Sequence, residues 1–341
     1  MSDRFRYFED YQVDQKGMTV SGFGNRTVTD ADIVNFACLT GDYHRNHLDR
    51  HYMANSIYGE RVAHGLLGSC LVTGMLSLSA PHIVGRGVPG AYFYSFDANY
   101  RGAIKLGDTI NIQWHVAEKV SDPTHEGFGL VKTTFQLVNQ EGTSVYDGTL
   151  TTLVRKKLTK DAELQLKPGV PWQVTEFVPD PEQLYYAEDY PVGKGGETDG
   201  RTITETDIVN FAGLTGDYHP QYVDAEFARR SMFGERIAHG MLVFSIAFGL
   251  WGRDRDQYQE PKSRIAGHLN DKSTFLVPVK VGDTIRCRYK TTASRVSKSK
   301  PEAGIVTFGL QVVNQRNEVV QEGSVILMIP SRTGLRVQST A

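Results

Sequence analysis

A carboxylate and an imidazole stand five residues apart, at Asp42 and His47, within the sequence GDYHRNHLD that begins at Gly41. Histidine titrates near neutral pH, and its surroundings can raise or lower the pKa of a carboxylate. Such a pair can move the protons of one water molecule, which is general acid–base chemistry. Spacing alone also fits a turn residue beside a surface histidine, so the pair indicates catalysis only in combination with other features.

The sequence AHG at 63–65 is the second feature of interest, because a loop is expected to become a buried helix there. A helix that begins without a capping side chain offers free backbone N–H groups and the positive end of its dipole. Such a helix start stabilises an oxygen that gathers negative charge in a transition state. Gly65 would let a ligand approach the backbone, although tight packing of the helix on a sheet explains a glycine equally well.

Helices come first among the elements that must position these residues. Thr29 and Asp32 form a capping-box pattern, and the apolar residues that follow at helical spacing predict a short helix. A second short helix is expected near residues 50–55. The stretch from Arg61 to Leu76, RVAHGLLGSCLVTGML, is apolar nearly all round, as expected for an enclosed helix.

Strands follow the helices. Alternating and aromatic patterns predict them at Ala91–Tyr100, Thr109–Val120, Gly129–Val138 and Ser144–Val154. Helices followed by a run of strands indicate an α+β fold with an antiparallel sheet. One long buried helix laid on such a sheet is the hotdog arrangement.

The chain repeats itself at a constant offset of 175 residues. Between Arg26–His44 and Arg201–His219, 15 of 19 positions are identical, and GDYHRNHLD returns as GDYHPQYVD. We therefore expect two hotdog domains packed as a pseudo-dimer, an N-terminal one at 1–157 and a C-terminal one at 195–341. The proline-containing segment 158–194 is predicted to be a surface linker.

Composition excludes some classes of function. The 341 residues contain 37 Lys and Arg against 39 Asp and Glu, a net charge of −2, so no overall field attracts nucleic acid or an anionic membrane. The three cysteines follow no disulfide or metal pattern, which favours a reducing, cytoplasmic location. We expect neither a secretory signal nor a membrane span, since the longest apolar run, MLVFSIAFGLW, has 11 residues.

Two other patterns could indicate bound groups. His44, His47 and His51 have a spacing that could hold a metal, but the second copy keeps only the first of them, so we expect no metal. GRGVPG at Gly85–Gly90 matches a nucleotide-binding motif by letter, yet its proline and the strand pattern after it favour a plain loop. No cofactor is expected.

Taken together, LTGDYHRNHLD, GERVAHGLL and LGDTI resemble, in this order, the signature of the MaoC-like dehydratases, the (R)-specific enoyl-CoA hydratases of the hotdog fold. The resemblance covers both copies and implies a double hotdog. It implies (R)-specific hydration of trans-2-enoyl-CoA, or dehydration of 3-hydroxyacyl-CoA, with an acyl-CoA thioester as the partner molecule. A homodimer of the two-domain chain is left open.

By the same resemblance, Asp42 and His47 are the catalytic residues that hold and activate water, and the N–H of Gly65 binds the thioester oxygen. Arg61 and His64, which belong to the same motif, are expected to contribute to the oxyanion or substrate site. In the second copy Tyr222 replaces the catalytic histidine, and a tyrosine is a poor base at neutral pH. One active site per chain is therefore predicted, with the second copy catalytically degenerate.

Two alternatives stay open. A hotdog acyl-CoA thioesterase would bind the same thioester but hydrolyse it, and the Asp-x4-His pairing with AHG argues against this reading. A non-catalytic acyl-CoA-binding subunit would be expected to have lost Asp42 or His47, and both are present.

Overall fold

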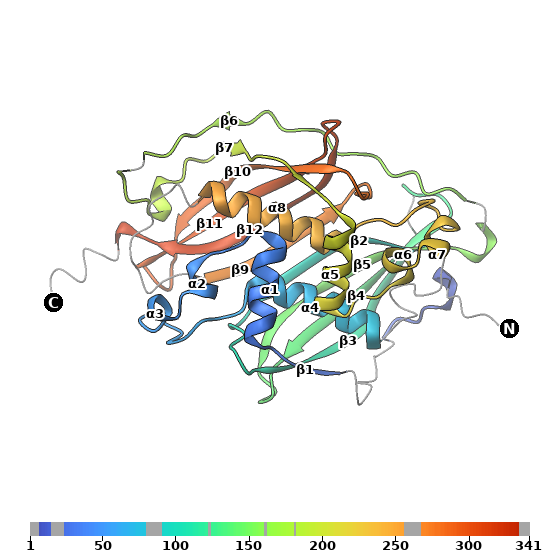
Figure 1. The fold of residues 1–341 in the computed structure, drawn as a ribbon, viewed down its shortest axis with the longest axis horizontal. Helices are drawn as coiled ribbons and strands as arrows, with labels where there is room; N and C mark the ends of the chain where they lie inside the picture. The colour runs from blue at the N-terminus through green and yellow to red at the C-terminus, as the bar shows by residue number, and fades with distance from the viewer. Residues whose placement is uncertain are drawn as a thin grey trace.

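The computed structural model describes residues 7–14, 24–79, 91–121, 124–159, 162–180, 182–255 and 267–333. The loop predicted at Gly85–Gly90 lies outside these residues. The structure is a double hotdog, with two helix-on-sheet copies joined edge to edge (Figure 1).

The N-terminal copy begins with helices and continues with strands, as expected. Its helices are η1 (Phe8–Asp10), α1 (Asp30–Thr40), α2 (Arg45–Leu48), α3 (Arg50–Met53), α4 (Gly65–Ser79) and η2 (Lys157–Thr159). Its strands are β1 (Asn25–Thr27), β2 (Ala91–Tyr100), β3 (Thr109–Ser121), β4 (Phe128–Val138) and β5 (Ser144–Arg155). The four longer strands lie within one residue of the predicted bounds at each end, which confirms them.

The rest of the chain repeats this order. Its helices are η3 (Ala187–Asp189), α5 (Glu205–Thr215), α6 (Pro220–Val223), α7 (Ala225–Arg229) and α8 (Gly240–Arg255). Its strands are β6 (Thr175–Glu176), β7 (Lys194–Glu197), β8 (Arg201–Thr202), β9 (Gly267–Phe275), β10 (Thr284–Val296), β11 (Ala303–Val313) and β12 (Val319–Pro330).

Strands of both copies form one continuous sheet, with the order β1-β3-β4-β5-β2-β9-β12-β11-β10-β7-β6 among the described residues. The copies join where β2 pairs antiparallel with β9, and Asp97 lies opposite Lys272 in that pairing. These two residues are 175 positions apart, so each occupies the same place in its own copy. The pseudo-twofold axis of the duplication therefore passes between β2 and β9.

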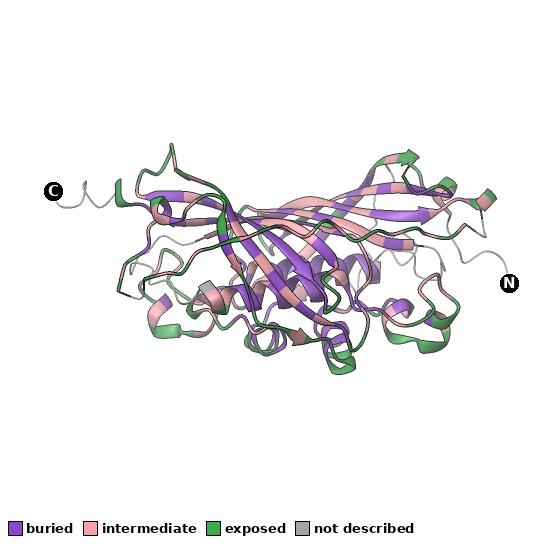
Figure 2. Cartoon of the chain, turned by 90° about the horizontal axis from the view of Figure 1, so that it is seen from above, coloured by how far each residue is buried: buried purple, intermediate pink, exposed green. Residues whose placement is uncertain are grey.

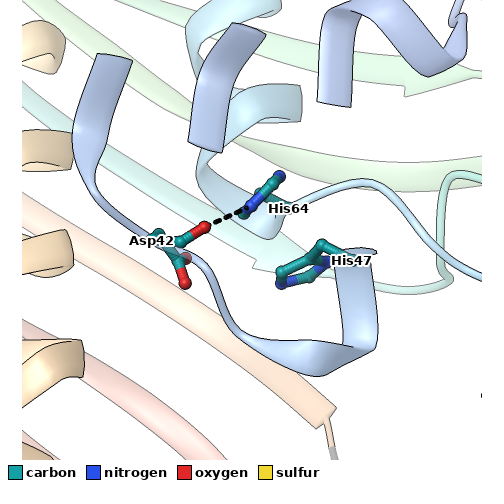
Figure 3. A group of neighbouring side chains, drawn as sticks. All are labelled: Asp42, His47 and His64. Carbon is teal, nitrogen blue, oxygen red and sulfur yellow. Dashed lines mark hydrogen bonds between the residues drawn. The ribbon is translucent and has the colours of Figure 1, made fainter. Parts of the chain in front are cut away.

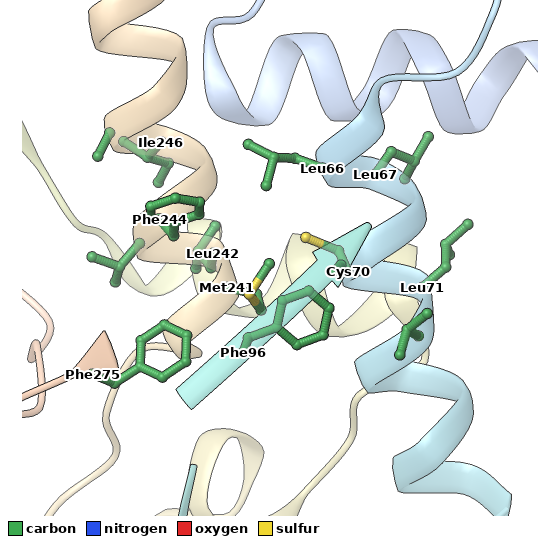
Figure 4. Close-up of a cluster of buried hydrophobic side chains, with 14 of the residues drawn as sticks. Leu66, Leu67, Cys70, Leu71, Phe96, Met241, Leu242, Phe244, Ile246 and Phe275 are labelled. Atoms are coloured by element: carbon green, nitrogen blue, oxygen red, sulfur yellow. The ribbon is translucent and has the colours of Figure 1, made fainter. Parts of the chain in front are cut away.

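The helices cover one face of the sheet, and most buried residues lie between the two layers (Figure 2). The helices α4 and α8 are buried at the centre, and apolar side chains of both meet over β2 (Figure 4). Leu67 and Leu242 are fully buried, and Cys70 contacts its own counterpart, Ser245, with 3.4 Å between Sγ and Oγ. Burial on nearly all sides explains why α4 is apolar around its whole circumference.

Capping boxes fix the start of the first long helix in each copy. The Thr29 side chain caps α1 by accepting a hydrogen bond from the Asp32 N–H, and the Asp32 carboxylate accepts one from the Thr29 N–H. Thr204 and Asp207 make the same pair of bonds at the start of α5. This confirms the predicted helix start. The sequence did not predict that α2 begins directly at Arg45, so that His47 lies on a helical turn rather than in a loop.

Each copy supports the other through a glycine on its central helix. A methyl group at Gly249 on α8 would lie 2.2 Å from the carbonyl oxygen of Thr40, at the end of α1. The equivalent Gly74 on α4 faces the carbonyl of Thr215 in the same way, at 1.8 Å. Only glycine allows these backbones to approach so closely. The residues after Thr40 are thus held against the opposite copy.

The segment predicted as a linker runs along the sheet of the C-terminal copy. The Trp172 N–H donates to the side-chain oxygen of Gln311 on β11, and Ala187 packs against Gly304 of the same strand. The bounds 158–194 stay a prediction. No helix among the described residues is long and apolar enough to cross a membrane.

Candidate active site

Asp42 lies at the turn that ends α1. Gly41 adopts a left-handed conformation, with φ of 82°, and caps the helix, as glycine does readily. The Asp42 N–H then donates to Oγ1 of Thr40 (3.3 Å), and the Asp42 carboxylate accepts from the backbone N–H of His44 (3.2 Å). The side chain is buried, with 8% of the residue exposed. These bonds hold the carboxylate in one position on the turn.

His47 lies on α2, which is capped by a neighbouring histidine. Nδ1 of His44 accepts from the Asn46 N–H, and His219 caps α6 in the same way. The histidine that recurs in both copies therefore serves the local structure. Nδ1 of His47 lies 2.8 Å from the carbonyl oxygen of Val62. Because a carbonyl can only accept, Nδ1 carries the proton, and Nε2 of the neutral imidazole is left as an acceptor.

His64 lies behind the pair and fixes its geometry (Figure 3). Its Nε2 donates to the backbone carbonyl of Asp42 (3.0 Å), and its ring lies 3.8 Å from that of His47. Burial lowers the pKa of His64 well below its usual range, and the neighbouring His47 lowers it further. His64 is therefore a neutral buried donor that ties the Asp42 turn to the segment before α4.

Burial also lowers the pKa of His47, although the negative charge of Asp42 and the bond to Val62 act in the opposite direction. A lowered pKa keeps the imidazole unprotonated at neutral pH. His47 is accordingly in the state in which Nε2 can take a proton from water.

Gly65 is the first residue of α4 and faces a cavity of about 360 Å³. Asp42, His47 and Gly65 all line this cavity, so the structure brings these three predicted residues together. Among the described residues, no acceptor bonds the Gly65 N–H. The walls come from both copies, with Phe248, His268 and Met328 contributed by the C-terminal one.

Arg61 and His64, predicted as oxyanion or substrate-binding residues, do not line the cavity. Arg61 pairs with Asp30 at 2.8 Å. The corresponding Arg236 pairs with Glu205 in the second copy, which indicates that this contact serves the fold. The structure thus places both residues behind the cavity wall.

The second copy retains the same arrangement of rings, but a tyrosine replaces the catalytic imidazole and the cavity beside it is much smaller. The Tyr222 ring lies 3.7 Å from the His239 ring, as His47 does from His64. Burial raises the pKa of Tyr222 well above its usual range, so the hydroxyl is not a base at neutral pH. The cavity beside Asp217 and Tyr222 has only about 40 Å³.

In the structure, the residues that could together bind a metal differ from those that the sequence suggested. One ligand atom from each of Asp42, His47 and His64 lies within 4.8 Å of the others, whereas His51 is exposed on α3. A carboxylate with two neutral imidazoles can bind a divalent metal as well as a water molecule. His47 and His64 already make hydrogen bonds to carbonyl oxygens, which fits a role in proton transfer. Removal of metal ions with a chelator would distinguish this role from metal binding.

Sequence reasoning missed His268, a cavity-lining imidazole contributed by the C-terminal copy. Its position corresponds to Phe93 under the 175-residue offset. A comparison that looks only for identical residues in the two copies does not detect such a pair. A search for positions where one copy is polar and the other aromatic would have found it.

Comparisons with known proteins bear on the family of the chain. Residues 13–134 and 189–314 each match the family model of the MaoC like domain, which together is more than half of the chain. An (R)-specific enoyl-CoA hydratase of Rhodospirillum rubrum is 33% identical over 153 residues, covering 44% of this chain and 94% of the relative. A 3-hydroxybutyryl-CoA dehydratase of Methylorubrum extorquens is 33% identical over 119 residues, or 35% of this chain and 69% of the relative.

Solved structures match over nearly the whole chain. One, described as a putative MaoC domain protein dehydratase from Chloroflexus aurantiacus, has a TM-score of 0.74 at 18% identity and covers 97% of this chain and 99% of its own. Another, a conserved hypothetical protein of Mycobacterium tuberculosis described as a double hotdog fold, has a TM-score of 0.71 at 14% identity, with 95% and 98% covered. At these identities the structures support the fold alone.

Proposed function

Because this chain belongs to the MaoC-like dehydratase family, we propose that it hydrates trans-2-enoyl-CoA thioesters to (R)-3-hydroxyacyl-CoA, or catalyses the reverse dehydration. The observation that carries the proposal is the convergence of Asp42, His47 and Gly65 on one cavity. Two relatives that each align with one copy's length of this chain are named for this chemistry, one as an (R)-specific enoyl-CoA hydratase and one as a 3-hydroxybutyryl-CoA dehydratase.

His47 is the base in the proposed reaction. A water molecule lies between the Asp42 carboxylate and Nε2 of His47, and Nε2 removes one of its protons while the oxygen attacks Cβ of the enoyl group. The Val62 carbonyl accepts a hydrogen bond from Nδ1–H, with 2.8 Å between nitrogen and oxygen, and stabilises the imidazolium that results.

Gly65 serves the other end of the reacting system. Addition at Cβ moves the electron pair of the double bond toward the thioester, whose oxygen becomes an enolate oxyanion. The Gly65 N–H and the positive end of the α4 dipole stabilise that charge. The Asp42–His47 pair then returns the proton to Cα, so that both the oxygen and the hydrogen added come from one water molecule.

The second copy acts as a structural partner in this proposal. Its tyrosine and its small cavity leave neither a base nor room for an acyl chain. Its strands β9 and β12 supply a wall of the active cavity instead. One reaction centre per chain follows.

The direct test is to incubate the protein with a panel of trans-2-enoyl-CoAs and follow loss of the ultraviolet absorbance of the conjugated thioester. Chiral analysis of the product should give the (R)-3-hydroxyacyl-CoA. Asp42→Asn should reduce the rate by about 10²–10⁴-fold, the usual contribution of a positioned acid–base group. The matched control is Asp217→Asn, the corresponding change in the second copy, which should leave the rate nearly unchanged.

Three results would count against the proposal. Absence of hydration with every substrate would contradict the proposed activity, and so would an undiminished rate in Asp42→Asn. Release of free CoA thiol, without loss of the double bond, would assign the cavity to a thioesterase instead.

A further inference from the structure

A polar cluster of four residues adjoins Gly65, and two of its members, Tyr100 and His268, line the same cavity as Asp42 and His47. It consists of Ser69 on α4, Tyr100 on β2, and His268 and Asp271 on β9. Nε2 of His268 lies 2.6 Å from one carboxylate oxygen of Asp271, and the Tyr100 hydroxyl donates to the other. Oγ of Ser69 lies 2.9 Å from the same hydroxyl. The cluster joins the two copies across their shared strands.

The fold does not require these polar groups. Under the 175-residue offset the four positions correspond to Phe244, Phe275, Phe93 and Phe96. Phe93 and Phe275 pack against each other with 4.7 Å between ring centroids, just as His268 packs against Tyr100 at the same distance. The same backbone therefore accepts a fully apolar cluster beside the second, closed site. The polar groups come from both copies but lie only on the side of the pseudo-twofold axis that has the open cavity.

The carboxylate of Asp271 determines the charge of the cluster. The residue is 1% exposed, and His268 is the only cationic side chain within ion-pair distance of it in the described part of the chain. A buried carboxylate without a cation costs several kcal/mol. Burial and the charge of Asp271 raise the pKa of Tyr100 well above its usual range, so its hydroxyl stays a neutral donor. The His268 ring, 2.6 Å from this carboxylate, is therefore the group placed to compensate its charge.

The geometry directs the other ring nitrogen of His268 toward the start of α4. Nε2 is occupied by Asp271, which leaves Nδ1. A methyl group built on Gly65 would lie 2.7 Å from Nδ1 of His268, so this nitrogen adjoins the glycine on the cavity side. Phe248 stacks on the ring, with an interplanar angle of 14°, and fixes its plane.

Two of the histidines that line the cavity, His47 and His268, have different surroundings. Burial lowers the pKa of His47, and the neighbouring His268 lowers it further, whereas His268 has a buried carboxylate as its partner. His47 is suited to accept a proton and His268 to donate a hydrogen bond to negative charge.

We propose that His268 donates a second hydrogen bond to the thioester oxygen, beside the N–H of Gly65, and that the oxyanion site is therefore completed by the C-terminal copy. Asp271 and Tyr100 are positioning residues that hold the His268 ring. This inference rests on the proposed function, because it places the thioester carbonyl at Gly65. It explains why the second copy is retained although its own site is closed.

The kinetic test replaces His268 by phenylalanine, the residue that the other copy carries at the same place. Loss of one oxyanion donor lowers kcat by about 10²–10³-fold. Because the bond strengthens only as charge develops, KM should change by less than about 3-fold. His268→Gln, which keeps a neutral N–H donor, should recover part of the loss, and Asp271→Asn should give an intermediate value.

Phe93→Leu is the matched control on the other side of the pseudo-twofold axis. It should leave kcat within about 3-fold of the unchanged protein, since no substrate oxygen lies there. A similar loss of kcat in His268→Phe and Phe93→Leu would overturn the proposal. So would a full recovery of activity in His268→Phe at saturating substrate.

A spectroscopic test separates this inference from the proposed function. Butyryl-CoA cannot be hydrated, and its thioester C=O stretching band, isolated by ¹³C labelling, should move to lower frequency on binding. The shift should be smaller in His268→Phe, with circular dichroism as the control for folding. A His268-dependent shift without any hydration activity would contradict the proposed reaction but support the contact between His268 and the thioester carbonyl. Hydration activity with a band that His268→Phe leaves unchanged would sink the inference alone.

Discussion

A close approach between the copies, at Gly249, gives a prediction that depends on the geometry alone. Gly249→Ala would place a methyl carbon 2.2 Å from the carbonyl oxygen of Thr40. Carbon and oxygen atoms in contact normally stay about 3.3 Å apart, so the backbone at Thr40 must move by roughly 1 Å. Overpacking of this kind costs about 1–3 kcal/mol of stability.

The displacement reaches the catalytic turn, because Asp42 follows Thr40 by two residues and its N–H donates to the Thr40 side chain. Misplacement of a reacting group by about 1 Å can lower the rate by about 10²-fold. We therefore expect Gly249→Ala to fold with a lowered Tm and to lose about 10²-fold in kcat on an enoyl-CoA substrate.

Gly74→Ala is the matched control. The methyl group there would lie 1.8 Å from the carbonyl oxygen of Thr215, so the stability loss should be at least as large. The segment displaced belongs to the closed site, and kcat should stay within about 3-fold of the unchanged protein. Thermal melts and steady-state kinetics on both variants test this. Equal losses of kcat would refute the reasoning, as would a Gly249→Ala protein with full activity.

Four further predictions concern the side chains of the site. Because burial lowers the pKa of His47 and its unprotonated form is the base, kcat/KM should rise with pH through a midpoint below about 6.5; a midpoint at or above that value would contradict the stated burial effect. NMR titration should show the His47 midpoint lower still in Asp42→Asn, since the Asp42 charge raises this pKa. Arg61→Ala removes a partly exposed ion pair with Asp30 and should cost about 0–1 kcal/mol of stability, as Arg236→Ala should. The kcat should be unchanged in both variants. A large fall in kcat for Arg61→Ala alone would support a substrate-binding role for Arg61. Dialysis against a chelator should leave hydration intact, and activity lost and then recovered with a divalent metal would assign Asp42, His47 and His64 to a metal.

Much of the fold could be predicted from the sequence because its signals are local. The capping box at Thr29, the all-apolar helix after His64 and the alternating strands each depend on neighbouring residues, and the structure confirms them. The duplication then extends each of these local predictions to the second copy. The double hotdog follows from these signals together.

The parts of the site that sequence reasoning missed are those that depend on long-range contacts. His268 and Gly65 are separated by about two hundred residues and meet only because β2 pairs with β9. Likewise, nothing near Arg61 shows that its guanidinium is paired with Asp30 on another helix. The side-chain partners that decide whether a residue faces the cavity come from the opposite copy or from another element, and spacing along the chain does not record them.

The comparison of His47→Ala with Tyr222→Phe tests the central claim most directly, because these residues occupy the same position in the two copies. With a trans-2-enoyl-CoA as substrate, the account predicts that His47→Ala lowers kcat by about 10²–10⁴-fold and that Tyr222→Phe stays within about 3-fold of the unchanged protein. Comparable losses in both variants, or hydration that survives in His47→Ala, would contradict a single acid–base centre in the N-terminal copy.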